Sequence, residues 1–479
     1  MATLVLPDVP RKKMDAATLA ALLSSAFKEV LIAARKLNPP LEPFSVWRTT
    51  AGGSHDEVLQ RPSVLKTILE AVIGSMAAPA CRALIDYVWQ HGGQPLEVTR
   101  DNGQPPGRDA WEPMCVNVLL AFPLSRLLED ASVRALHATG QWNDWAVSDS
   151  AIELTARWTA EGEINDGAWI RATVPLLNVT LLPGVQEIEL EPGIWLRDWT
   201  SADSAAYVHT AKQRLESSEA PRMMFGTMSQ VEFALPMIDP RPGGRLDHSG
   251  FQRGAQDLLS RVMVRVKWAL MVAAPAQDVP IEMPPSIESF GSMMGFFPIR
   301  RQAALHRWGG MHIDADAAVR AKQLLAALAA AERRFSDLES ALWLLDRSIL
   351  AELSRDVLLD AAIGLERILV PESGENTRRF KQYGAALMGD SALVGVLGKI
   401  YQERSTVAHH GIPSNKDKID MYAPLARRYL AKCIERVTAW VAAGYLGGGS
   451  SKLNKAIEDY LVDKMCAAPV PPNSQEKKS

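Results

Sequence analysis

Cysteine is scarce in this sequence. The 479 residues include four cysteines, Cys81, Cys115, Cys433 and Cys466, and none of them belongs to a CxxC pair. Structural zinc sites and disulfide frameworks both need characteristic cysteine spacings, so neither kind of site is indicated. We therefore expect reduced and mostly buried thiols.

A surplus of charge of either sign is also missing. The chain has 52 basic and 55 acidic residues, which gives a formal net charge of −3. The overall charge gives no reason to expect a nucleic acid or an anionic membrane as partner. Any such partner must bind a local patch.

Targeting and membrane signals are lacking as well. The N-terminus, MATLVLPDVPRKKMD, places a short apolar run before its basic residues, which reverses the order found in a signal peptide. No apolar run approaches the roughly 18 residues that span a bilayer. The sequence therefore predicts a cytoplasmic protein with no membrane partner.

Several standard catalytic motifs are absent. The sequence has no GxxxxGK(S/T), no GxGxxG after a predicted strand and no GxSxG. Nucleotide hydrolysis, dinucleotide chemistry and α/β-hydrolase activity therefore lack support. Ser54, His55 and Asp56 are consecutive, but a catalytic triad must converge in space and direct neighbours point apart.

A second polar group lies in the segment HRWGGMHIDAD. It contains His306, His312, Asp314 and Asp316. Their spacing matches no standard zinc or calcium motif, and Asp314 is better placed as the N-cap of a following helix. We expect neither a metal nor a cofactor.

The apolar pattern divides the chain into four parts. Residues 1–140 are mostly helical in period, residues 141–310 mix strand-like runs with helical pieces, and residues 311–446 are helical throughout. Residues 447–479 hold the hinge GGGSSK, a short predicted helix and a tail predicted to be disordered. We predict an α+β multidomain protein with a helical N-terminal region, a mixed α/β middle domain and a C-terminal all-α helix bundle.

Three runs in the middle part are predicted to be strands. They are AIELTARWTA, QEIELEPGIWLRDWT and SQVEFALPM. Helices are predicted between them, at SADSAAYVHTAKQRLESS and FQRGAQDLLSRVMVRVKWALMVAA.

One predicted helix of the bundle ends in a cluster of polar residues. The segment YQERSTVAHHG places Arg404, His409 and His410 in the last turns of that helix. At about 100° per residue, His409 shares a face with Ser405 and Tyr401, whereas Arg404 and His409 are about 140° apart. A long arginine side chain can bridge part of that separation.

These residue types allow two interpretations. In the first, the arginine and the histidines meet the negative end of the helix dipole, and the following glycine caps the helix. In the second, the arginine binds phosphate oxygens and a histidine moves a proton near neutral pH. Such a pair can deprotonate a ribose 2′-hydroxyl and counter the charge of a phosphorane-like transition state, which is metal-independent RNA cleavage.

The same segment resembles the signature of the HEPN superfamily, in which an arginine, four to six further residues and a histidine follow one another. Both His409 and His410 satisfy this spacing from Arg404. The resemblance implies a homodimer in which two such helices face each other across one composite cleft.

An upstream block strengthens the resemblance. The stretch LLDAAIGLERILVPESGENTRRFKQYGAALMG resembles the Apea-like HEPN pattern, with Glu366 at its glutamate position and Arg378 or Arg379 at its basic position. The resemblance covers residues 320–445. Glu366 then either pairs with an arginine of the active helix or supports the bundle.

The resemblance implies a metal-independent endoribonuclease, in a bacterial toxin or phage-defence setting. Arg404 and one of the two histidines would be catalytic, with His409 favoured because Ser405 could orient its ring. Tyr401 belongs to the same matched segment. A basic strip, made of Arg378, Arg379 and Lys381, either contacts RNA or is a solvated helix face.

Two other readings stay open. The bundle could be a catalytically silent HEPN module for dimerisation or for binding RNA or a nucleotide, with Arg404 and His409 only a helix-end feature. It could instead act with an unknown protein partner, as an antitoxin-like nucleotide-binding protein.

Overall fold

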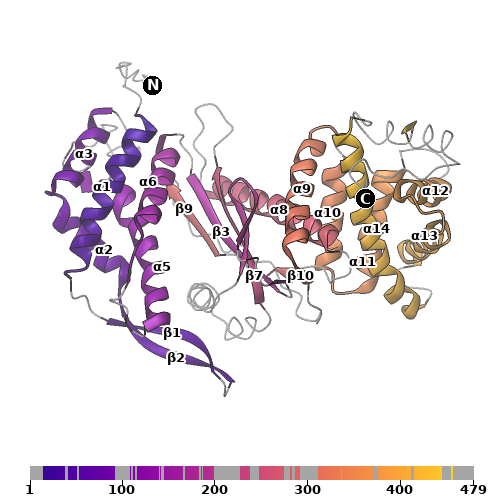
Figure 1. The fold of residues 1–479 in the computed structure, drawn as a ribbon, viewed down its shortest axis with the longest axis horizontal. Helices are drawn as coiled ribbons and strands as arrows, with labels where there is room; N and C mark the ends of the chain where they lie inside the picture. Colours follow the sequence, from indigo (N-terminus) through magenta and orange to yellow (C-terminus); the bar gives the residue numbers. More distant parts are fainter. Residues whose placement is uncertain are drawn as a thin grey trace, which may run out of the picture.

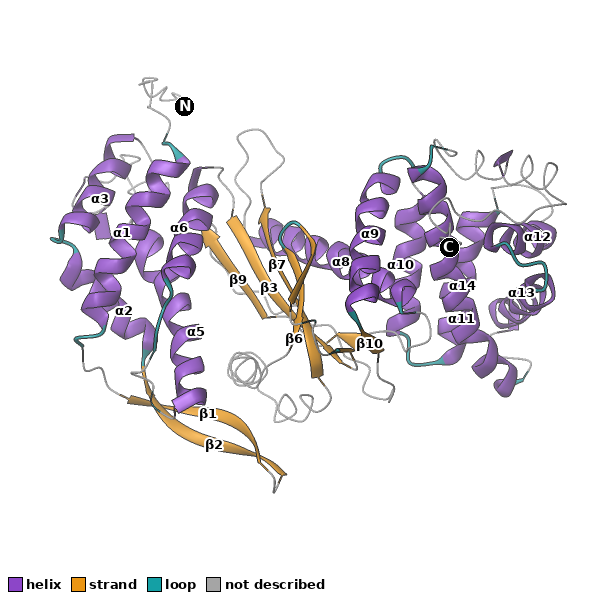
Figure 2. Cartoon of the chain, viewed as in Figure 1, coloured by secondary structure: helices purple, strands orange, loops and turns teal. Residues whose placement is uncertain are grey.

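The chain forms a helical N-terminal part, a central sheet and a C-terminal helix bundle, as a computed structural model shows (Figure 1). Helices predominate over a few small sheets, so the predicted α+β class is confirmed (Figure 2). The structure describes residues 14–37, 41–50, 53–91, 108, 112–113, 116–139, 141, 145–164, 168–177, 179–182, 185, 187–198, 227–237, 248–274, 281–282, 286–291, 311–335, 337–370, 376–410, 415–444 and 455–456.

The N-terminal part is a cluster of helices around one apolar core. Its elements are α1 (Ala16–Ala34), α2 (Val64–Ser75), α3 (Pro79–His91), the π-helical turn η1 (Asn117–Ala121), α5 (Phe122–Thr139) and α6 (Asp149–Ile164). The first helix begins at Asp15, whose carboxylate accepts a hydrogen bond from the Thr18 amide at 2.7 Å. Phe27, Leu84 and Ala156 are buried in the shared core.

Helix α6 corrects one prediction, because the run AIELTARWTA was expected to be a strand. Its buried residues Ile152, Ala156 and Ala160 recur every four positions, which is the spacing of one helix face. A period of two could be read from the same letters. The helix instead packs against α1 and also against the central sheet.

A β-hairpin that was not predicted interrupts the N-terminal helices. Strand β1 (Leu41–Thr50) pairs antiparallel with β2 (Gly53–Pro62), from Leu41 opposite Pro62 to Thr50 opposite Gly53. In Figure 1 the hairpin extends away from the helices.

Helix α1 also corrects the expectation about apolar runs, because it is long and apolar enough to cross a membrane by length and composition. In this structure it packs against α2, α3 and α6. Leu19, Leu23 and Val30 on its inner face are fully buried. Its apolar residues thus serve the N-terminal core.

The central sheet has the strand order β5, β6, β7, β3, β8, with β9 also paired to β3. Its strands are β3 (Ala168–Leu177), β5 (Glu187–Glu191), β6 (Ile194–Asp198), β7 (Thr227–Met237), β8 (Ile281–Glu282) and β9 (Ser286–Gly291). A separate parallel pair joins β4 (Val179–Leu181) to β10 (Met311–Ile313). The predicted strands in QEIELEPGIWLRDWT and SQVEFALPM are confirmed, whereas the helix predicted at SADSAAYVHTAKQRLESS lies outside the described residues.

The C-terminal bundle is helical, as predicted. Its members are α9 (Ala315–Glu332), α10 (Asp337–Leu350), α11 (Ser354–Leu369), α12 (Asn376–Met388), α13 (Leu393–His410) and α14 (Lys416–Ala442). Asp314 caps α9 by accepting a hydrogen bond from the Ala317 amide at 2.7 Å, as expected. Of the predicted hinge and tail, only residues 455–456 are described.

Helix α8 (His248–Ala273) joins the sheet to the bundle (Figure 1). Trp268 is fully buried and donates its indole N–H to the carbonyl oxygen of Ala431 in α14, at 3.1 Å. Lys267 is also fully buried and forms an ion pair with Asp346 in α10. Apolar packing therefore continues across the predicted boundary at residue 310.

We expect Asp346→Ala to lower the free energy of unfolding by about 3–5 kcal/mol, because Lys267 would then be left in the core without its carboxylate. The double change Lys267→Met, Asp346→Leu should recover most of that loss, since two apolar side chains replace a costly buried pair. Urea denaturation of the full chain measures both values.

The exposed ion pair between Arg320 of α9 and Glu435 of α14, at 2.9 Å, provides the control. We expect Arg320→Ala to cost no more than about 1 kcal/mol. Equal losses at both pairs would contradict a special role for the buried pair.

Candidate functional site

A tight turn between α12 and α13 positions the predicted site residues. Gly389 follows α12 with a φ of 71°, a left-handed conformation that suits glycine. The next amide, that of Asp390, donates to the carbonyl oxygen of Ala385 at 3.0 Å. Helix α13 then runs back along α12, so that the rings of Phe380 and Tyr401 lie 5.2 Å apart. The start of α12 is thereby placed beside the last turns of α13.

Arg404 is anchored to a neighbouring helix. Its Nη2 atom donates a hydrogen bond to Oε2 of Glu366 in α11 at 2.6 Å. The two side chains are only 24% and 19% exposed, so the ion pair is largely shielded from water. Of the two roles considered for Glu366, pairing with the arginine of the candidate active helix is the observed one.

The ion pair between Arg404 and Glu366 leaves one hydrogen-bond donor of the arginine without an acceptor. The Nε atom of Arg404 is buried and has no hydrogen-bond partner. A buried donor without an acceptor costs about 1–3 kcal/mol, and native structures retain few of them. The guanidinium is therefore held in place without being saturated by protein acceptors.

Burial dominates the electrostatics of Glu366. Desolvation raises the pKa of this carboxyl above its usual range, although Arg404 and, more weakly, Arg367 act to lower it. Because the net shift is upward, the ion pair does not repay the cost of burying the carboxylate.

The two histidines end α13. His409 is exposed in the last turn, while the side chain of His410 lies outside the described part of the structure. Ser405 lies one turn before His409 and is half-buried. Tyr401 packs on Phe380 of α12, so its ring belongs to the bundle packing.

The basic strip lies on the first turns of α12. Arg378 is exposed and donates from Nε to Oε1 of Gln382 at 2.9 Å, and Arg379 is half-buried. The stem of Lys381 lies over Gly398 of α13, where an added Cβ atom would come within 2.9 Å of Lys381 Cδ. Both arginines thus stand at the end of the bundle that carries Arg404.

Two helix N-termini flank the end of α13. One belongs to α12 and the other to α14. In the first turn of α14, the Nζ atom of Lys418 lies 4.0 Å from Oε1 of Glu403 in α13. Helix N-termini carry partial positive charge and favour anions. With Arg404, they make this end of the bundle suited to a phosphate.

The two polar groups of the segments GGSHDE and HRWGGMHIDAD form no candidate site among the described residues. Ser54, His55 and Asp56 occupy consecutive positions of β2. His312 is exposed on β10, Asp314 is the α9 cap, and His306 lies outside the described residues. Within the described ranges, no group of three or more His, Cys, Asp or Glu residues could hold a metal ion.

The two cysteines that the structure describes are reduced and buried, as predicted. Cys81 and Cys433 are free and buried, and burial raises their pKa values to about 11 and about 12. Such thiols are inert rather than catalytic. Cys115 and Cys466 lie outside the described residues.

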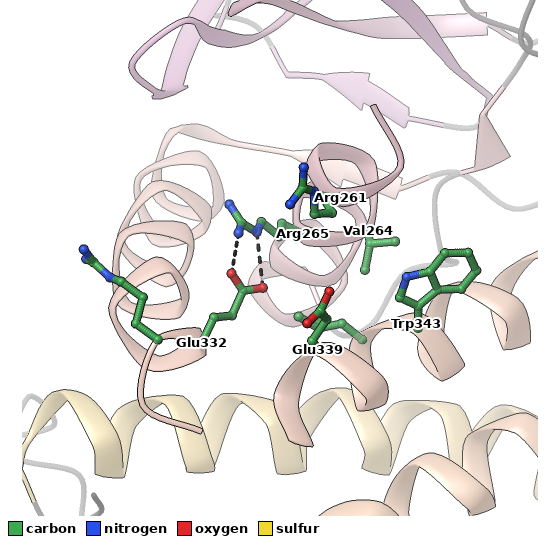
Figure 3. Close-up of a pocket in the computed structure, with 8 residues that line it drawn as sticks. Arg261, Val264, Arg265, Glu332, Glu339 and Trp343 are labelled. Carbon is green, nitrogen blue, oxygen red and sulfur yellow. Dashed lines mark hydrogen bonds and ion pairs between the residues drawn. The ribbon is translucent and has the colours of Figure 1, made fainter. Parts of the chain in front are cut away.

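One further candidate was missed by the sequence reasoning. A pocket lies between α8, α9 and α10, and Arg261, Arg265, Glu332, Glu339 and Trp343 contribute to its lining (Figure 3). The available signal was a pair of i, i+4 spacings, Arg261 with Arg265 and Glu339 with Trp343, which place each pair on one helix face.

Comparison with known proteins gives no match: no family model, no curated protein and no solved structure matches this chain.

The raised pKa of Glu366 predicts a pH trend. A carboxyl whose pKa is higher in the folded chain than in the unfolded chain stabilises the fold less as the pH rises through that interval. We expect Glu366→Gln to gain stability relative to the wild type as the pH rises above about 4, the ordinary pKa range of a glutamate. Urea denaturation at each pH measures the difference.

The matched control is Asp420→Asn on the exposed face of α14. If instead the wild type gained on Glu366→Gln with rising pH, attraction to Arg404 would outweigh burial, and the account of this pair would be wrong.

Proposed function

We propose that the C-terminal bundle is an HEPN-type endoribonuclease that cleaves RNA without a metal ion. The carrying observation is the Arg404 guanidinium, which Glu366 holds through one nitrogen and which keeps 24% of its side chain exposed, five residues before the exposed His409. Arg404 supplies the positive charge for a phosphate, and His409 supplies the group that moves a proton.

The reaction follows from these roles. One histidine takes the proton of a ribose 2′-hydroxyl, the 2′-oxygen attacks phosphorus, and the bond from phosphorus to the 5′-oxygen breaks. The histidine of the facing copy in a homodimer protonates the leaving 5′-oxygen. Arg404 counters the charge of the pentacoordinate transition state, and Glu366 acts as a positioning residue. The products are a 2′,3′-cyclic phosphate and a 5′-hydroxyl.

Several features support an RNA substrate. Arg378 and Arg379 begin α12 beside the end of α13, and the N-termini of α12 and α14 favour anions at the same end. The buried, free Cys81 and Cys433 fit a reducing cytoplasm. A role in toxin or phage-defence systems belongs to the same proposal and is supported by resemblance alone.

A second function draws on the same ion pair. Because Glu366 already occupies one nitrogen of Arg404, the bundle could be a silent HEPN module that dimerises and binds RNA or a nucleotide. In that case RNA binding is retained when Arg404 and His409 are removed, and the wild type shows no cleavage.

We expect the purified full chain to cleave RNA in the presence of EDTA. Arg404→Ala should reduce the rate by about 100- to 1,000-fold, because a donor to the transition state is lost. His409→Ala should reduce it by about 100-fold or more, through loss of proton transfer. Gel analysis of a labelled RNA and identification of its cyclic phosphate ends provide the measurement.

His312→Ala is the matched control, because this histidine is also exposed but lies on β10. It should leave cleavage unchanged, and His410→Ala tests the second histidine separately. Full RNA cleavage by the Arg404→Ala, His409→Ala double variant would rule out the proposed site.

A further inference from the structure

The pocket between α8, α9 and α10 has a volume of about 220 Å³. Figure 3 shows its labelled side chains, contributed by three helices. The lining residues are Arg261, Val264, Arg265, Glu332, Arg333, Glu339, Leu342 and Trp343. None of them belongs to the candidate ribonuclease site.

The pocket has an apolar floor and a polar rim. Val264 of α8 and Leu342 of α10 are buried, at 6% and 2% exposure, and both line the pocket. Arg261 stands on the α8 side and is exposed, while Trp343 stands on the α10 side with 48% of its surface exposed. A large indole left half open to solvent is an unusual use of surface area.

The charges at the rim are not balanced. Arg265 is held by Glu332 through two hydrogen bonds, of which Nε to Oε1 measures 3.2 Å, so this pair is neutral as a unit (Figure 3). Of the other charged side chains, Arg261 and Arg333 are positive and Glu339 is negative. Among the lining residues alone, positive side chains therefore outnumber negative ones by one.

Nearby carboxylates explain why Arg265 is committed to its partner. Glu191 of β5 is close enough to Arg265 and Glu332 for both to influence its pKa, which burial raises. Its Oε1 atom is buried without a hydrogen-bond partner. Arg265 thus faces two acids. Arg333 donates from Nε to the Ala329 carbonyl oxygen at 3.3 Å, so the guanidinium group of Arg261 is the one left for an external anion.

We propose that this pocket binds a small aromatic anion. Its ring stacks on the indole of Trp343, and its phosphate or carboxylate group accepts hydrogen bonds from Arg261. Glu339 accepts a hydrogen bond from a hydroxyl or amino group of the ligand. This binding site is distinct from the Arg404 site and does not depend on RNA cleavage.

The size of the pocket limits the ligand. Pockets for drug-sized molecules usually enclose about 300–1,000 Å³, so 220 Å³ admits one ring system with one anionic group. Mononucleotides and aromatic carboxylates share this chemistry. The two ligand classes differ in the anionic group, which is a phosphate in a mononucleotide and a carboxylate in the other class.

Isothermal titration calorimetry of the full chain tests the proposal, with AMP, GMP and indole-3-acetate as probes. Saturable binding of a nucleotide identifies a phosphate ligand, and binding of indole-3-acetate alone identifies a carboxylate ligand. We expect Arg261→Ala and Trp343→Leu each to weaken binding by about tenfold or more. Both side chains are exposed and lie outside the buried core.

Two controls separate this site from others. Arg428→Ala removes an exposed arginine of α14 outside the pocket and should leave binding unchanged. The Arg404→Ala, His409→Ala variant should also bind normally, because the ribonuclease site is elsewhere.

Three results would overturn the proposal. The first is no saturable binding of any probe up to millimolar concentration. The second is binding that Arg261→Ala and Trp343→Leu leave unchanged. The third is inorganic phosphate binding as tightly as AMP, which would remove the role of the ring.

Discussion

The burial of helix α8 is the constraint on which the rest of the structure depends. Lys267 and Trp268 lie next to each other in this helix, both fully buried, and bind Asp346 of α10 and the Ala431 carbonyl of α14. A buried charge and a buried indole N–H each need a polar partner, so these two contacts favour the observed docking of the helix. The sheet and the bundle are thereby joined through a common core.

The docking of α8 also determines where the two candidate sites of the bundle lie. The face of α8 beside α9 and α10 carries the pocket, while α11, α12, α13 and α14 meet at the end that carries Arg404. At that end, buried Glu366 has a raised pKa and Arg404 keeps an unpartnered Nε atom. Both features lower the stability of the fold at this end of the bundle. Such costs are common where side chains are arranged for function.

The sequence predicted the helices of the bundle well, because their apolar stripes are long and regular. It failed at α6, where AIELTARWTA fits both a strand and a helix, and at the β1–β2 hairpin. The pairing of Arg404 with Glu366 could be considered but not decided, because 38 residues separate the two. The pocket could not be found, since its two i, i+4 pairs face each other only after α8 docks.

In the proposed reaction the ribose 2′-hydroxyl is the attacking group, and its removal tests this role directly. Two RNAs of one sequence, one unmodified and one with 2′-O-methyl groups at every ribose, are incubated with the full chain in EDTA. We predict that the unmodified RNA is cut to fragments with cyclic phosphate ends and that the methylated RNA stays intact. Cleavage of both RNAs at the same rate would contradict the account.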